Sequence, residues 1–237
     1  MTEKKERIAK VMADAGLCSR REAERWITAG RVSVNGQVLA TPACVVGAAD
    51  KIVVDGKEIG KKQDRRLWAY HKPAGLITTH ADPKGRTTVF EKLPKYLPRV
   101  ISVGRLDYNT EGLLLLTTDG ALARELELPS RGWSRKYRVR VHGSITPDII
   151  AKLSKGIEIE GIKYAPAILE IERVQGTNTW ALMTLKEGKN REIRRLMEYF
   201  NLPVTRLIRI SYGPFQLGNL EVGAVREVTQ KALGEVL

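Results

Sequence analysis

The chain has 237 residues, of which 43% are hydrophobic and 28% charged, a composition typical of a folded protein rather than a disordered or fibrous one. No apolar run approaches the roughly 18 residues of a membrane span, and no secretory signal is evident, so we expect a cytoplasmic protein. Two cysteines and three scattered histidines form neither a disulfide framework nor a metal-site spacing. The net charge of +13 favours a polyanionic partner such as nucleic acid.

The first 60 residues combine two short helices with two tight hairpins. Apolar residues at helical spacing predict a helix over 7–13. The capping-box pattern Ser19-Arg20-Arg21-Glu22 begins a second helix, which extends to about Thr28. Asn35-Gly36 and Asp55-Gly56, each flanked by β-type residues, predict hairpin turns.

A polar, charged segment separates this part from the rest of the chain. We therefore predict a small domain at 1–62 and a larger one at 63–237, with a linker at about 60–66. Residues 1–62 carry 12 Lys and Arg against 8 Asp and Glu, and residues 63–237 carry 28 against 19. Because both parts are basic, the positive charge does not belong to a detachable tail.

The larger part mixes strands with few helices. A strand at 67–70 runs into His71-Lys72-Pro73-Ala74-Gly75, where Pro and Gly break it. The further predicted elements are strands at 101–103 and 113–116, a helix at 121–128 opened by Asp119, an alternating strand at 136–141 and a helix at 190–200. This pattern predicts an α+β fold rather than repeated βαβ units.

A polar loop between the strands at 101–103 and 113–116 contains Asp107. Gly104 and Gly112 bracket this loop and allow a sharp turn that presents polar side chains in a cleft. Taken alone, Asp107 is better explained as a turn residue that caps its own backbone. Its function therefore depends on the motifs that accompany it.

Several segments in order resemble the bacterial ribosomal RNA pseudouridine synthases of the RsuA/RluB family. The loop Gly104-Arg105-Leu106-Asp107 with the following 109–120 resembles their catalytic motif, and 8–54 resembles the S4 RNA-binding domain. Further family segments are matched by 71–75, 136–139, 187–195 and 207–214. The resemblance covers nearly the whole chain. It implies an α+β fold in which a small S4-like helix-helix-hairpin domain precedes a larger, mixed and mainly antiparallel sheet domain.

The resemblance also implies a reaction and its catalytic residues. Pseudouridine formation breaks the C1′–N1 bond of uridine, turns the base and rejoins it through C5, which needs a carboxylate and no redox cofactor. The family's aspartate corresponds to Asp107, either as nucleophile at C1′ or C6 or as base. Arg194 corresponds to the cation that keeps this carboxylate ionised, and Tyr137 to the tyrosine that stacks on the base. Leu207 corresponds to an apolar residue beneath the base, and Arg105 to the arginine that fills the gap left by a flipped base.

Ribosomal RNA, free or in an assembling subunit, is the implied partner of a monomer without metal or other cofactor. The candidate RNA-binding cations are Arg20, Arg21, Arg25 and Arg31 in the S4-like part and Lys136, Lys189 and Arg195 in the larger part. Strand alternation divides the cations of 131–140 over two faces, so only some can contact phosphates. Asn109 favours the large-subunit, RluB-like members (23S RNA), although the long basic C-terminal tail of some of them has no counterpart here.

Two other functions fit parts of the same pattern. A non-catalytic RNA-binding factor of ribosome assembly would use the same basic surfaces, but it would not need a carboxylate in a cleft. A glycosidase shares the chemistry at C1′, but it normally uses a second carboxylate, and none stands out beside Asp107. His71 stands where many relatives have asparagine, and we assign it no role.

Overall fold

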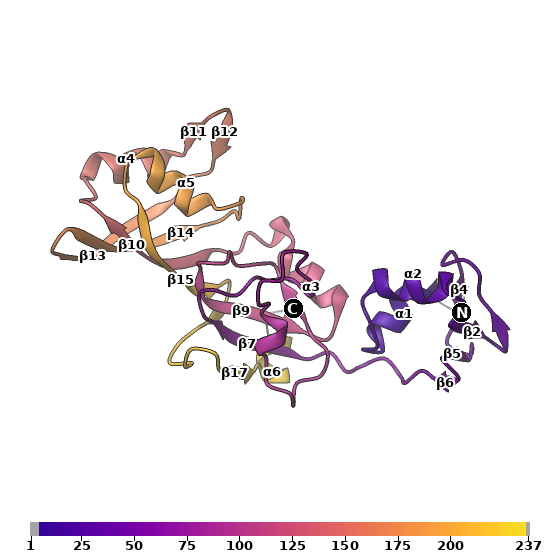
Figure 1. The fold of residues 1–237 in the computed structure, drawn as a ribbon. Coiled ribbons are helices and arrows are strands. Elements are labelled where there is room, and N and C mark those ends of the chain that lie inside the picture. Colours follow the sequence, from indigo (N-terminus) through magenta and orange to yellow (C-terminus); the bar gives the residue numbers. More distant parts are fainter. Residues whose placement is uncertain (1–4, 236–237) are drawn as a thin grey trace. The chain divides into compact units, whose positions relative to one another are not determined.

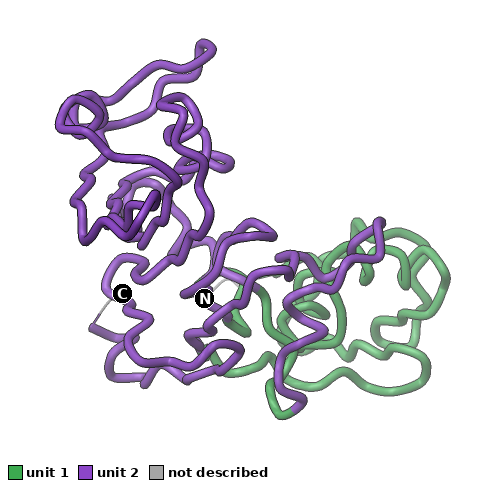
Figure 2. The backbone as a smooth tube through the Cα atoms, turned by 60° about the vertical axis from the view of Figure 1, so that its left-hand side comes forward, with its two compact units in different colours: residues 1–66, 96–101, 117–122 green, residues 67–95, 102–116, 123–237 purple. Residues whose placement is uncertain are grey.

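The computed structural model describes residues 5–235, which divide into two compact units (Figure 2). The first unit contains the chain up to Arg66 together with the segments 96–101 and 117–122. The second unit contains 67–95, 102–116 and the chain from 123 onward. Two short segments of the later sequence thus complete the first unit, and Thr117 Oγ1 donates a hydrogen bond to the Arg66 carbonyl there (2.6 Å). No helix that the structure describes is long and apolar enough to cross a bilayer.

The first unit consists of a helix pair and short hairpins (Figure 1). Its elements are β1 Glu6–Arg7, α1 Ile8–Asp14, α2 Arg20–Thr28, β2 Val32–Val34, β3 Gln37–Val38, β4 Val45–Val46, β5 Ile52–Val54 and β6 Lys57–Glu58. The strands form a four-stranded sheet in the order β3-β2-β5-β6, and β1 pairs with β4. Ile8, Met12 and Ile27 from the helices pack with Val32 and Ile52 from the sheet.

Local signals in the sequence explain these elements. Ser19 Oγ accepts a hydrogen bond from the Glu22 amide (3.2 Å), and the Glu22 carboxylate accepts one from the Ser19 amide (2.9 Å), so the predicted capping box is confirmed. Both hairpin turns are confirmed as well. Asn35 and Asp55 have positive φ, as do the glycines that follow them, and β2–β3 and β5–β6 pair around them.

The second unit is built on a nine-stranded sheet. Its main path is β13-β14-β10-β15-β9-β7-β17, with β8 paired to β9 and β16 paired to β15. The strands are β7 Leu67–Lys72, β8 Ile101–Val103, β9 Glu111–Thr117, β10 Arg135–His142, β13 Ile168–Gln175, β14 Asn178–Leu185, β15 Val204–Tyr212, β16 Phe215–Gln216 and β17 Val225–Glu227. Most pairs are antiparallel, whereas β15 and β9 run parallel. The expected α+β fold with a mixed, mainly antiparallel sheet is confirmed.

Two helices cover one face of the β10, β14 and β15 part of this sheet (Figure 1). The remaining elements are η1 Phe90–Lys92, α3 Gly120–Glu127, η2 Pro129–Arg131, α4 Pro147–Lys155, β11 Ile157–Ile159, β12 Ile162–Tyr164, α5 Glu192–Tyr199 and α6 Gln230–Gly234. Leu153 of α4 and Leu196 of α5 pack on Val139 and Met183 of the sheet. Asp119 accepts hydrogen bonds from the first amides of α3, as predicted.

The start of α5 corrects the predicted helix at 190–200. Arg191 has a left-handed backbone (φ 52°), so the helix begins only at Glu192. The preceding segment 186–191 is therefore a loop. This difference matters because that loop forms part of the site described below.

The parallel contact between β9 and β15 depends on Gly112. Its φ is +102°, and a Cβ atom at this position would lie 2.3 Å from the Arg209 carbonyl oxygen. Only two residue pairs join the strands, Glu111 with Ile208 and Gly112 with Arg209. A glycine is thus required where these two strands approach most closely.

Candidate active site

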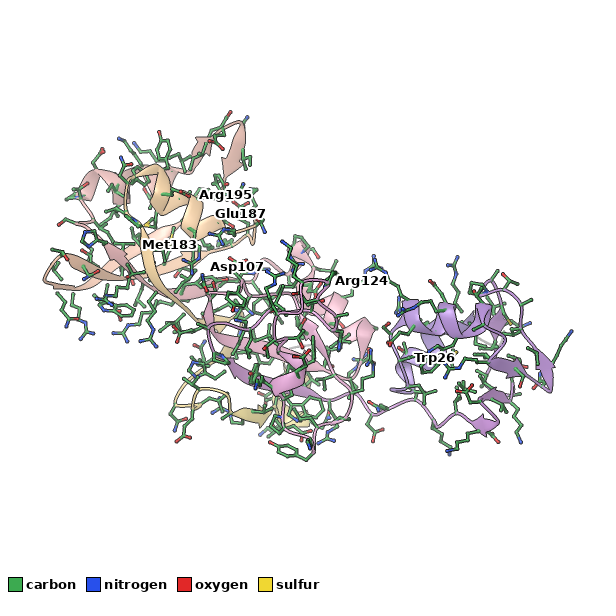
Figure 3. The ribbon with its side chains drawn as sticks, viewed as in Figure 1. Trp26, Asp107, Arg124, Met183, Glu187 and Arg195 are labelled. Carbon is green, nitrogen blue, oxygen red and sulfur yellow. The ribbon has the colours of Figure 1, made fainter. Side chains whose placement is uncertain are left out.

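Asp107 lies in the loop that connects β8 to β9 (Figure 3). Leu106 is buried, and its backbone carbonyl accepts a hydrogen bond from Thr78 Oγ1 (2.9 Å). The Asp107 carbonyl accepts a hydrogen bond from the Thr110 amide (3.0 Å), which closes a tight turn. The loop is therefore fixed on both sides of Asp107, whose half-buried side chain lines a cavity.

The cavity has a volume of about 620 Å³, within the range of small-molecule sites. Its walls come from the loop 102–110, the start of β10, the segment 185–193 and the end of β15. All of these segments belong to the second unit. The sequence predicted the loop 186–191 to be partly helical. Its residues 188–191 line the same cavity as the Asp107 loop.

Tyr137 and Leu207 give this cavity an apolar surface. Tyr137 on β10 is half-buried, packs against the core and lines the cavity. Leu207 on β15 pairs with Val139 of β10, is 4% exposed and lines the cavity as well. An aromatic ring beside an aliphatic side chain suits a planar ligand such as a nucleobase.

Arg194 on α5 contacts the backbone of the Asp107 loop. Its guanidinium donates hydrogen bonds to the carbonyls of Asn109 (2.9 Å) and Val204 (3.2 Å). Burial and the neighbouring Arg191 lower the pKa of Arg194, and the charge of Asp107 opposes this shift. Arg194 therefore acts on Asp107 by its electric charge and by holding the loop in place. The structure shows a contact between Arg194 and the loop backbone rather than a direct ion pair with the Asp107 carboxylate.

Lys72, at the end of β7, holds the same loop from inside the protein. Its side chain is fully buried, and Nζ lies within hydrogen-bond distance of the carbonyls of Thr110 (2.8 Å), Pro73 (2.9 Å), Asp107 (3.2 Å) and Tyr108 (3.4 Å). Burial lowers the pKa of Lys72 to about 8, while the charge of Asp107 opposes the shift. Two cations, Lys72 and Arg194, thus fix the backbone that carries one carboxylate.

The cavity carries more positive than negative charge. Its lining cations are Arg105, Arg135, Lys189, Arg191 and Arg209, and its lining carboxyl groups are Asp107, Glu127 and Glu192. An excess of cations favours a phosphate-bearing ligand. Carboxyl groups beside an apolar surface that suits a base, in a cavity with an excess of cations, are an arrangement that fits chemistry on a nucleotide.

Comparison with known proteins agrees with this arrangement. The family model for RNA pseudouridylate synthase matches residues 66–199, and the S4 domain model matches residues 6–52. The chain belongs to the RNA pseudouridylate synthase family. Its reaction class is therefore that of an isomerase acting on RNA, and the expected S4 domain at the N-terminus is confirmed.

Relatives over most of the chain carry the same family name. An uncharacterized RNA pseudouridine synthase of Rickettsia felis is 51% identical over 229 residues, covering 96% of this chain and 99% of the relative. The ribosomal large subunit pseudouridine synthase B of Yersinia pestis is 46% identical over 218 residues, covering 90% of this chain and 69% of the relative. A solved pseudouridylate synthase structure shares the fold with a TM-score of 0.70 at 24% identity, covering 98% of this chain and 99% of the other.

Five of the residues that the resemblance assigned to this pseudouridine synthase meet at the cavity. Asp107, Tyr137, Leu207, Arg105 and Lys189 all line it. The Lys189 ammonium is engaged with the Glu187 carboxylate and with the Lys163 carbonyl (2.7 Å). Arg194 reaches the Asp107 loop from a position just outside the lining.

Other candidate RNA-binding residues of the synthase lie away from the cavity. Strand alternation places Lys136 on the face of β10 opposite to Tyr137, and Arg195 is exposed on α5 outside the lining (Figure 3). In the S4 domain, Arg20, Arg21 and Arg25 are exposed on α2.

Arg31 of the S4 domain differs from the other candidates because its charge already has a partner. It donates hydrogen bonds to both oxygens of Asp55, at 2.9 and 2.5 Å, and lies 4.7 Å from the centre of the Trp26 ring (Figure 3). This contact supports the β5–β6 turn at Asp55. Arg31 therefore contributes to the fold of the S4 domain through its contact with Asp55.

Several residues of the synthase site had no predicted role, among them Lys72, Arg209 and Glu192. Arg209 is 3% exposed, donates a hydrogen bond to the Leu113 carbonyl (2.7 Å) and lines the cavity. A signal for Lys72 exists, since it ends an otherwise apolar strand directly before Pro73. Neither it nor Arg209 could be placed without knowing which distant carbonyls they reach.

Proposed function

We propose that this chain isomerises a specific uridine of ribosomal RNA to pseudouridine, with Asp107 as the catalytic carboxylate. The observation that carries the proposal is the placement of Asp107 in a basic cavity that Tyr137 and Leu207 also line. Relatives from Yersinia pestis and Pseudomonas aeruginosa, 46% and 43% identical, are named ribosomal large subunit pseudouridine synthases. Together with Asn109, they support 23S RNA of the large subunit as the substrate.

The proposed reaction rearranges bonds within one nucleotide. The C1′–N1 bond breaks, the base turns, the C1′–C5 bond forms, the proton on C5 leaves to solvent and N1 gains a proton. No electrons enter or leave overall, so the proposal includes no cofactor. Asp107 assists glycosidic cleavage at C1′, attacks C6 or removes a sugar proton, and each route needs it as a carboxylate.

Two cations, Lys72 and Arg194, lie near Asp107. Closing a site around a carboxylate favours its neutral form, and nearby cations oppose that effect. Lys72 and Arg194 are near enough for the charge of Asp107 to raise the pKa of each against the effect of burial.

Tyr137, Leu207 and Arg105 would hold the uridine and its surroundings. A base inside folded RNA must leave its stack before it can turn. Tyr137 offers the aromatic face for the extruded base, and Leu207 the apolar surface beneath it. Arg105 is exposed at the cavity, where it can occupy the gap that the base leaves in the RNA.

We also propose that the two domains of the chain have different roles, one in RNA binding and the other in the reaction. Residues 1–62 bind a structured RNA element through the exposed cations of α2, and residues 63–237 carry out the reaction, with the polar segment 60–66 joining them. Lys136, Lys189 and Arg195 extend the basic surface of the larger domain. The protein acts as a monomer, and a ribosomal RNA substrate places the reaction in the cytoplasm.

The test is tritium release from ribosomal RNA labelled at C5 of uridine, with wild type beside Asp107→Asn. RNA is taken from a strain that lacks the gene, both as free 23S and 16S RNA and within assembling subunits. We expect release by the wild type alone on 23S RNA, with equal RNA binding by the two proteins. Because asparagine keeps the shape of the side chain, loss of release would follow from loss of the charge.

Two outcomes would contradict the proposal. Release by Asp107→Asn at the wild-type rate would remove Asp107 from the reaction. Tight RNA binding without release by either protein, on free RNA and on assembling subunits, would favour the non-catalytic assembly factor. Release only from 16S RNA would leave the chemistry in place and overturn the large-subunit assignment.

A further inference from the structure

Glu192 is a buried carboxyl group beside the cavity that the proposed reaction does not use. It is the first residue of α5 and is 4% exposed. Its Oε2 accepts a hydrogen bond from the Lys189 amide (2.8 Å), whereas its Oε1 has no hydrogen-bond donor among the described residues. Burying a carboxylate oxygen without a hydrogen-bond donor costs free energy. Protonation of that oxygen removes the charge and therefore the cost.

A second carboxyl group, Glu187, lies beside Glu192. Glu187 accepts a hydrogen bond from the Ala165 amide (2.8 Å) and forms an ion pair with Lys189. Burial and the charge of Glu187 favour the neutral form of Glu192. The contact with Lys189 lowers the pKa of Glu187 against the effect of burial. The titrations of the two carboxyl groups are therefore coupled, and a proton is more stable on the more buried member, Glu192.

The charged groups that line the same cavity as Glu192 are Arg105, Asp107, Glu127, Arg135, Lys189, Arg191 and Arg209. Lys189 comes from the same loop, and Arg135 of β10 lies near Gly188, where a Cβ atom would be 3.4 Å from its Nε. Arg209 of β15 lines the same cavity. Burial, with the charge of Glu187, raises the pKa of Glu192 to about 7, and Lys189 opposes the shift.

We propose that Glu192 is a positioning residue of the active site: as a neutral acid it donates a hydrogen bond to the Glu187 carboxylate and holds the 187–191 loop closed against α5. The inference rests on the proposed function, because the loop presents Lys189, Asn190 and Arg191 to the same cavity. Loss of the proton places two negative charges side by side and frees the loop. RNA binding then weakens while Asp107 keeps its surroundings.

Two glutamine variants test the inference. Glu192→Gln keeps a hydrogen-bond donor toward Glu187 at every pH, and Glu187→Gln removes the charge that holds the proton on Glu192. KM and kcat for 23S RNA are measured between pH 6 and pH 8 for both, for wild type and for Glu170→Gln, an exposed control on β13. We expect the wild-type and control KM to rise about tenfold over this range, as the closed form is depopulated. Both glutamine variants should keep the wild-type KM of pH 6 throughout this range, so that the readout is the pH profile of KM.

Either of two results would overturn the inference. A Glu192→Gln protein whose KM rises with pH as in the wild type would show that the proton of Glu192 does not control binding. A Glu192→Gln protein that has already lost RNA affinity at pH 6 would show that the carboxylate itself is needed. A role confined to folding would change stability and leave the pH profile of KM as it is.

Unfolding measurements separate this inference from the proposed function. Glu192 has a raised pKa in the folded chain, so its contribution to stability is complete below its ordinary pKa and is lost as pH rises through about 7. The free energy of unfolding of wild type should therefore fall across this window relative to Glu192→Gln. This difference is measurable even if no ribosomal RNA is modified, and parallel profiles of the two proteins would reject the neutral Glu192.

Discussion

Lys72 connects the end of one strand to a loop 35 residues further along the chain. Four backbone carbonyls surround its ammonium group, and three of them belong to the turn at Asp107, Tyr108 and Thr110. Carbonyl groups that converge in this way repel one another unless a cation lies between them. The position of Asp107 is therefore set by a residue that does not itself line the cavity.

We expect Lys72→Met to lower both stability and activity. Methionine has a similar shape but leaves buried carbonyls without a donor, which costs about 1–3 kcal/mol for each unsatisfied group. A displaced Asp107 loop should reduce kcat by about tenfold to a hundredfold. Urea unfolding and single-turnover tritium release measure the two effects, with the exposed Lys92→Met as control. An unchanged kcat would show that the loop keeps its position without this cation.

The pH dependence of stability provides a second check on Lys72. Burial lowers its pKa to about 8 from an ordinary value of 10.5, so the unfolded chain binds this proton more readily between these values. The free energy of unfolding of wild type should therefore rise with pH across this window, relative to Lys72→Met. Equal slopes for the two proteins would mean that Lys72 is solvated in solution.

Sequence reasoning proposed residues for the site but not the residues that hold them in place. Asp107, Tyr137 and Leu207 were assigned from a resemblance of ordered motifs, and the structure brings all three to one cavity. Lys72 and Glu192 lie in the same motifs and received no role. Their importance comes from burial and from partners distant in the chain, which no local pattern records.

At the scale of elements, the approach of β9 to β15 rests on one glycine. A Cβ atom on Gly112 would lie 2.3 Å from the oxygen and 2.7 Å from the nitrogen of the Arg209 backbone. These are main-chain atoms within a strand and cannot move aside independently. The strand that follows the Asp107 loop is therefore held at a fixed distance from the strand that carries Leu207.

We expect Gly112→Ala to be destabilising by more than about 1 kcal/mol, because alanine is strained at this φ and collides with β15. Separation of the strands should also move Asp107 away from Leu207 and lower kcat. Gly218→Ala is the control, since that glycine also has positive φ but has open space around its Cβ position. Equal losses of stability in the two variants would assign the effect to backbone strain alone.

Elements were predictable where the signal was local. The capping box at Ser19, the turns at Asn35-Gly36 and Asp55-Gly56, and the cap at Asp119 depend on neighbouring residues, and the structure confirms all of them. The start of α5 was missed because Arg191 adopts a left-handed backbone that its residue type does not favour. The parallel pairing of β9 with β15 was not visible either, since strands that pair in parallel are distant in sequence.

For the whole molecule, positive charge is the property that both parts of the chain share. Each part has an excess of Lys and Arg over Asp and Glu, so each can release counterions from RNA. Two binding surfaces on one chain also strengthen each other, because binding of the first raises the effective concentration of the second. The S4 domain should therefore add affinity without taking part in the chemistry.

We expect the triple variant Arg20→Ala, Arg21→Ala and Arg25→Ala to weaken RNA binding and spare kcat. The slope of log affinity against log salt should fall by about 2–3, if each arginine contacts one phosphate. Filter binding from low to moderate salt measures the slope. A triple change of the exposed Lys152, Lys155 and Lys231 to alanine removes the same charge elsewhere and serves as control. An identical slope for both triples would show that α2 has no special contact with RNA.

The two-residue pairing between β9 and β15 has a mechanical consequence for the cavity. Long antiparallel ladders stiffen the sheet on the β10 side, but this short parallel contact is all the strand pairing that the described chain provides between β15 and β9. The two parts of the sheet are thus joined at a short contact between β9 and β15. Asp107 lies in the loop before β9, and Tyr137 lies on β10, which pairs with β15. Two arginines also connect the two parts of the sheet. Arg194 of α5 donates a hydrogen bond to the Asn109 carbonyl, and Arg209 of β15 donates one to the Leu113 carbonyl of β9. The separation of Asp107 from Tyr137 across the cavity therefore depends on a short strand contact and on the side-chain contacts of a few arginines, including Arg206 with Glu111.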